Sequence, residues 1–218
     1  MDMPIIQLLV LAGIAIFLIL RLRSVLGTRD GFERPPVSHS EDEDRRNSFE
    51  AIDGGPDRDI IDHAAEGSPM ADALSAIKRA DNSFNVGEFL GGARGAYEMI
   101  LMAFENGELD DVVPYLSPEV YEAFAEVVDE REKQGLKVEA TFVGVSDTKL
   151  VVAEFDQASG EADITVRFSG EFTYVVRNAE GEIVEGSTSE IKRQRDTWTF
   201  SRKMGIDDPN WLLVATGE

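Results

Sequence analysis

Two aspartates within predicted strands, Asp163 and Asp196, are the residues best placed by type and position to do chemistry. A carboxylate held inside a folded domain can act as a general base, because burial raises its pKa toward neutral values. Both residues lie in segments of alternating apolar and polar side chains, and we expect both carboxylates to be exposed. An exposed carboxylate is a poor general base at neutral pH, so we expect a protein that is not an enzyme.

Other kinds of catalytic or ligand site are disfavoured by residue type. Cysteine is absent, so the chain has neither a disulfide nor a thiolate nucleophile. The two histidines, His39 and His63, lie in polar sequence, whereas a metal site or a catalytic triad needs a rigidly held imidazole. The pair Gly91-Gly92 lacks the lysine and hydroxyl residue of a phosphate-binding loop. We therefore expect no cofactor and no metal.

The charge of the chain limits its partners. There are 42 acidic and 21 basic side chains, which give a net charge of −21. Such a field repels phosphate backbones and weakens adsorption to an anionic membrane surface. We expect no nucleic-acid partner.

Aromatic side chains form the candidate site for an apolar ligand or a protein partner. They have two interpretations, an ordinary hydrophobic core or the lining of a pocket that a cone-shaped sheet fills only partly. The candidates are Tyr97, Phe104, Tyr121, Phe124, Phe168, Phe172, Trp198, Phe200 and Trp211, and Phe142 and Tyr174 belong to the same set.

Helices must position the first of these aromatic residues. Ser68-Pro69 and Ser117-Pro118 are typical N-caps followed by proline, and Gly107 and Gly135 are typical stops. The pattern predicts helices over residues 69–80, 86–106 and from 118 to about 134. The first is short and amphipathic, and packing on a membrane, on a partner or on its own domain are all open.

After Gly135 the apolar period changes from that of a helix to that of a strand. Gly170 interrupts one apolar face, as a bulge or bend would. Helices followed by strands predict an α+β domain over residues 81–218, with helices packed on one face of a curved antiparallel sheet. The predicted strands are Val138–Val145, Thr148–Phe155, Ile164–Val176, Glu190–Ser201 and Trp211–Thr216.

The N-terminal residues 1–23 predict a single transmembrane anchor. Met3–Leu22 is almost entirely apolar, and a helix of this length spans the roughly 30 Å of a bilayer core. Arg21, Arg23 and Arg29 follow it, which places that side in the cytoplasm by the positive-inside rule. We expect a bacterial inner-membrane protein with its N-terminus outside and its C-terminal domain in the cytoplasm. Residues 24–68 are acidic and poor in large apolar residues, and predict a disordered linker.

Several segments of the folded part resemble a known family. Asp81–Leu90, Leu116–Phe124 (LSPEVYEAF), Asp196–Phe200 (DTWTF) and Pro209–Leu213 (PNWLL) are similar to the C-terminal domain of the mitochondrial import-motor scaffold family. They resemble in particular its alphaproteobacterial members, called TimA or Tim-like proteins. The resemblance covers about residues 81–218.

The resemblance implies a cone-shaped fold like that of nuclear transport factor two, and an adaptor at a membrane. The mitochondrial relative tethers an Hsp-seventy-type chaperone to the import channel, and its domain contains an apolar pocket thought to admit acyl chains. This sequence differs by its own anchor and by a short acidic linker in place of a long basic region.

We therefore expect a membrane-anchored adaptor that binds a protein partner or an apolar segment, with a chaperone or a translocase as candidate partners, in translocation or membrane-protein assembly. One alternative is a module that binds lipid or a small apolar ligand in the aromatic pocket. A second alternative is an enzyme on the same fold, which requires a buried carboxylate.

Overall fold

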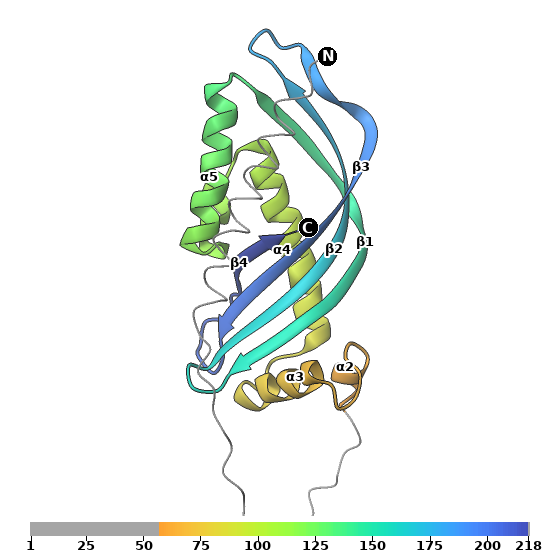
Figure 1. The fold of residues 1–218 in the computed structure, drawn as a ribbon, viewed down its shortest axis with the longest axis vertical. Helices are drawn as coiled ribbons and strands as arrows, with labels where there is room; N and C mark the ends of the chain where they lie inside the picture. Colours follow the sequence, from red (N-terminus) through yellow and green to blue (C-terminus); the bar gives the residue numbers. More distant parts are fainter. Residues whose placement is uncertain (1–56, 218) are drawn as a thin grey trace, which may run out of the picture.

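Four antiparallel strands form one sheet in the order β1-β2-β3-β4, which curves around a long central helix (Figure 1). The computed structural model describes residues 57–217 of the chain. The architecture is α+β, as the sequence predicts. The predicted anchor and most of the predicted linker lie outside the described residues. Among residues 57–217 no helix is long and apolar enough to cross a membrane.

The sheet consists of three long strands and one short one, β1 (Lys137–Asp156), β2 (Glu161–Arg177), β3 (Ile183–Lys203) and β4 (Leu212–Gly217). The prediction of two strands divided at Ser146-Asp147 was wrong, because β1 continues through these residues. Both halves of β1 pair with β2, and the register shifts between Val145 and Asp147 instead of turning the chain. An irregularity of this kind bends a strand without ending its pairing.

The helices begin and end at local signals. They are α2 (Arg58–Ile61), α3 (Pro69–Ala80), α4 (Val86–Asn106), the 3₁₀ helix η1 (Asp110–Tyr115) and α5 (Pro118–Lys133). The side chains of Ser68, Asn85 and Ser117 cap α3, α4 and α5 by accepting a backbone N–H of the first turn. Gly107 ends α4 in the left-handed conformation, with φ of 76°.

Residues 57–68 are ordered, although the sequence predicts them as part of the linker. Ile60 of α2 is buried in the core. The carboxylate of Asp59 accepts the backbone N–H groups of Val86 at 2.9 Å and Gly87 at 3.1 Å, and Lys78 Nζ lies 2.7 Å away. A carboxylate at this position satisfies free donors of the first turn of α4 and interacts favourably with its dipole. These contacts are long-range, which explains why local composition did not reveal them.

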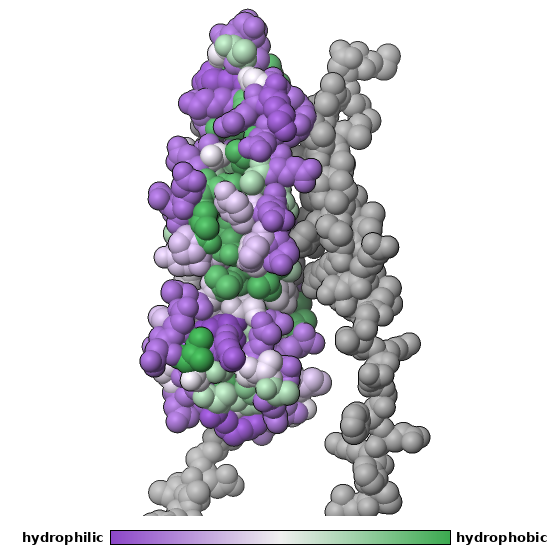
Figure 2. All heavy atoms as spheres, turned by 90° about the vertical axis from the view of Figure 1, so that its left-hand side faces the viewer, coloured by the Kyte–Doolittle hydropathy of each residue, from purple (hydrophilic) through white to green (hydrophobic). Residues whose placement is uncertain are grey.

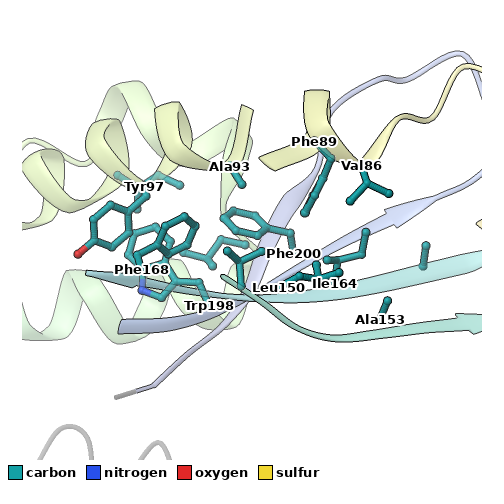
Figure 3. Packing of buried hydrophobic residues seen from close by; sticks show 14 of the residues in the cluster. Val86, Phe89, Ala93, Tyr97, Leu150, Ala153, Ile164, Phe168, Trp198 and Phe200 are labelled. Atoms are coloured by element: carbon teal, nitrogen blue, oxygen red, sulfur yellow. The ribbon is translucent and has the colours of Figure 1, made fainter. Parts of the chain in front are cut away.

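The hydrophobic core lies between α4 and the concave face of the sheet (Figure 3). The ring of Tyr97 stacks on Phe168 with 4.5 Å between centroids, and its centroid lies 4.8 Å from that of Trp198. α3 extends this core, since Leu74 and Ile77 are fully buried and α3 contacts β1.

Gly170 was predicted to mark a bulge or bend of its own strand, but its role is different. It lies opposite Val145, and the register shift is on the β1 side. A Cβ atom at Gly170 would lie only 2.4 Å from Tyr97 Oη. The position therefore needs glycine because an aromatic side chain of α4 packs directly on the strand.

Candidate functional site

Five of the nine predicted pocket residues lie inside the core. Tyr97, Phe168, Phe172, Trp198 and Phe200 are all buried. They come from α4, β2 and β3, and most of their rings are in direct contact with one another (Figure 3). In the described residues these side chains stabilise the fold by packing, and a ligand would have to displace some of them to contact the rest.

The other four predicted residues are half-buried and divide between the two ends of the helical layer. The rings of Phe104 on α4 and Phe124 on α5 lie 4.5 Å apart, and Tyr121 is on the same helix as Phe124. Trp211 lies at the far end, 4.7 Å from Phe89 between centroids. The structure therefore does not bring all nine residues around one cavity, and their role in binding stays a prediction.

A buried polar contact joins α4 to β3 in the middle of this core. Tyr97 Oη donates a hydrogen bond to Asp196 Oδ2 at 2.6 Å, and Gln194 Nε2 donates to Asp196 Oδ1 at 3.0 Å. Burial raises the pKa of Tyr97 above its ordinary value, and the adjacent carboxylate raises it further, so the phenol remains a donor.

The prediction that Asp196 is exposed was wrong. Its residue is only 8% exposed. The hydroxyl and the amide that bind it offset the cost of burying the carboxylate. Asp163, the other aspartate, is half-buried, and its Oδ1 atom has no hydrogen-bond partner among the described residues.

A second contact, which the sequence did not indicate, ties α5 to the end of α4. Arg131 Nη1 donates to the carbonyl oxygen of Phe104 at 3.3 Å, and its guanidinium lies 4.8 Å from the centre of the Phe104 ring. Arg131 Nη2 lies 3.5 Å from Glu105 Oε2. Burial raises the pKa of Glu105, and the charge of Arg131 opposes that shift. Arg131 therefore satisfies the last turn of α4 and covers its aromatic end.

Two surface hollows lie outside the aromatic core. The first, of about 600 Å³, separates the start of α3 from β1 and is mainly apolar. It is lined by Ala65, Ser68, Pro69, Met70, Ala73, Val151, Val152, Ala153, Glu154 and Phe155. The second, of about 520 Å³, lies between the end of α4 and α5 and is rich in carboxylates. Of the nine predicted residues only Tyr121 contributes to a described hollow.

The side of the domain that bears α5 presents an uneven surface. Figure 2 shows apolar side chains gathered along the middle of this side, between polar ones. Among residues 57–217 no group of three or more histidine, cysteine, aspartate or glutamate side chains converges to hold a metal ion. The geometry favours contacts with an apolar or polypeptide surface over bond-making chemistry.

Comparisons with known proteins agree with this geometry. The model of the Tim44-like domain family matches residues 70–218. The human mitochondrial import inner membrane translocase subunit TIM44 is 24% identical over 159 residues, which cover 72% of this chain and 35% of that protein. TIM44-1 of Arabidopsis thaliana is 23% identical over 195 residues, covering 84% of this chain and 40% of that one. The chain thus spans well under half the length of these relatives.

A search of solved structures adds one distant likeness. The intermembrane space region of the chloroplast protein ARC6 has a TM-score of 0.39 and 11% identity, and the match covers 60% of this chain and 92% of that one.

Proposed function

Because the chain belongs to the Tim44-like domain family, we propose that it is an adaptor that holds a partner protein at a membrane during protein translocation. The match of the family to residues 70–218 carries this proposal. The relatives are named as subunits of a mitochondrial import translocase of the inner membrane, and this chain has the corresponding domain. Their whole length is not represented here, so the machine served by this chain is part of the proposal.

The predicted anchor supplies the membrane part of the proposal. Residues 1–23 would hold the domain at a bacterial inner membrane, with the N-terminus outside and residues 57–217 in the cytoplasm. The linker before Asp57 would keep the domain close to the bilayer. A protein partner, such as a chaperone or a translocase subunit, is then recruited to the membrane by the domain.

The proposal is tested by photocrosslinking in cells that express the full-length chain. A photoreactive residue at Tyr121 or at the exposed Val113 lies on α5 and η1, whereas Ile206 provides an exposed control on the β3–β4 loop. Trp198 is unsuitable because it is buried. Adducts with a translocase or chaperone subunit from the first two positions support the adaptor function. Adducts with lipid alone would contradict it.

Membrane tethering has its own test. Replacing residues 1–23 with an unrelated transmembrane segment should preserve function, and deleting them should abolish it. If the deleted form complements a knockout fully, tethering is not the purpose of the segment.

A ligand-binding module is the second candidate, and the apolar groove between α3 and β1 favours it. Its volume and lining would accommodate part of an acyl chain. Native mass spectrometry of the purified full chain should then show a bound lipid. Val152→Lys should reduce its occupancy, whereas Val143→Lys, at an exposed valine of the same strand outside the groove, should not. Equal occupancy in both variants would exclude this groove.

A further inference from the structure

β3 is much longer than the strand on its outer side. β4 pairs only with Thr197–Ser201, whereas β2 pairs with β3 from Ile183 to Lys203 (Figure 1). Within residues 57–217 no strand lies beside Ile191–Arg195 on the side away from β2. The backbone N–H and C=O groups along such an edge are a template for a further strand. The opening continues the line of β4.

The open edge is basic, unlike the domain around it. Ile191–Arg195 reads IKRQR, in a region of 12 basic and 28 acidic side chains between Asp81 and Glu218. Arg193 is 81% exposed in its side chain and pairs with Glu171 at 2.9 Å. Lys192 and Arg195 are also exposed, and neither has a carboxylate within ion-pair distance in the described part of the chain. The edge thus carries positive charge that the fold does not neutralise.

The positive charges of the edge lie on both faces of the sheet. Lys192 points to the concave face, where its Nζ atom lies 4.7 Å from the ring centre of Tyr174 and 5.4 Å from that of Phe172. Arg193 and Arg195 alternate with it and lie on the convex face. An added strand would therefore meet basic side chains on both of its faces. Carboxylates in the added strand would be favourable on either side.

We propose that Ile191–Arg195 binds an acidic, extended segment of a partner protein by strand addition. This inference rests on the adaptor function proposed above and names the chemistry of the partner. Charge disfavours a second copy of the chain, because antiparallel self-pairing would place Arg193 opposite Arg193. β1, at the other edge of the sheet, is less suitable because its pairing with β2 shifts register three times and its charges are mixed.

The test uses the full-length chain in detergent and a fluorescent peptide of about seven residues that alternates glutamate with valine. We expect saturable binding, measured by fluorescence anisotropy, and slower hydrogen exchange of the amides at Ile191–Arg195. A peptide of the same charge with a central proline should bind at least about tenfold more weakly, because proline removes a ladder donor and distorts the strand. Equal binding of the two peptides would overturn strand addition.

Charge reversal locates the site. Lys192→Glu with Arg195→Glu should weaken the acidic peptide by about tenfold or more and favour a lysine–valine peptide instead. The matched control reverses Lys149 and Arg167, a basic cross-strand pair of the same sheet away from this edge. Equal loss in the control would mean unspecific charge attraction and would overturn the proposal. Protection of Ile191–Arg195 without peptide would also overturn it, assigning the edge to a second copy if it depends on concentration and otherwise to residues 41–44.

The outcomes separate this inference from the adaptor function. If the peptide fails to bind while crosslinks from Tyr121 still identify a translocase subunit, strand addition is wrong and the adaptor function stands. If the peptide binds at the edge and no protein is crosslinked from any position, the edge is confirmed as a binding site and the adaptor function fails.

Discussion

The hydroxyl of Tyr97 donates to the carboxylate of Asp196 at 2.6 Å, joining the central helix to β3 between residues 99 positions apart in sequence. Both side chains are buried among aromatic rings. The contact therefore determines how α4 lies across the concave face of the sheet. It also explains why an acidic residue occurs within a strand whose inner face is otherwise apolar at Trp198 and Phe200.

Removing this hydroxyl should destabilise the domain. Tyr97→Phe keeps the ring but takes one donor from a buried carboxylate, which should lower the free energy of unfolding by about 1–3 kcal/mol. Chemical denaturation of the full chain measures the change. Tyr121→Phe, at a half-buried tyrosine, is the control and should change it by less than about 0.5 kcal/mol. Equal effects in the two variants would show that the Asp196 contact is not special.

Gly170 should tolerate no side chain. Gly170→Ala places a Cβ atom 2.4 Å from Tyr97 Oη, and the buried ring has no room to move. We expect a loss of about 1–3 kcal/mol in unfolding free energy from overpacking. Gly144→Ala is the control in the same sheet, since a Cβ atom there meets nothing within 4 Å. A neutral Gly170→Ala would mean that α4 shifts easily on the sheet.

Asp59 should make the domain sensitive to acid. Burial alone would raise its pKa, but hydrogen bonds from Lys78, Val86 and Gly87 outweigh it and hold the pKa below the ordinary 3.8. A carboxyl with a depressed folded-state pKa stabilises the fold above its unfolded pKa and loses this effect as pH falls through the folded value. Asp59→Asn should therefore lower stability at neutral pH and flatten its decline below about pH 4. Thermal unfolding across that range tests it, and an unchanged slope would contradict it.

Glu105 should act with the opposite sign. Burial raises its pKa, and the charges of Asp196 and Glu185 add to this while Arg131 and Lys192 oppose it. With a raised folded-state pKa, the ionised group costs stability at neutral pH, and this cost disappears as pH falls toward the ordinary 4.5. The part of the pH dependence that rises on mild acidification, between roughly pH 7 and pH 5, should vanish in Glu105→Gln. The same change at the exposed Glu108 should leave the profile unaltered.

The sequence by itself determined the helices and the class of fold. Ser68 and Ser117 cap their helices and Gly107 ends one through groups within a few residues, so the signals are local and can be read from spacing. The change of period after Gly135 likewise indicates strands without knowledge of their partners. The segments at Leu116–Phe124 and Asp196–Phe200 were enough to indicate the family, and the match over residues 70–218 confirms it.

Only the tertiary structure decided which residues meet. Whether Ser146-Asp147 turns the chain depends on the strand beside it, and β2 pairs with both sides. The burial of Asp196 depends on Tyr97, and the order of α2 depends on the first turn of α4, both distant in sequence. The open edge at Ile191–Arg195 follows from the short pairing of β4. Local propensity acts over a few residues, whereas burial, pairing and charge compensation depend on contacts that exist only once the chain has folded.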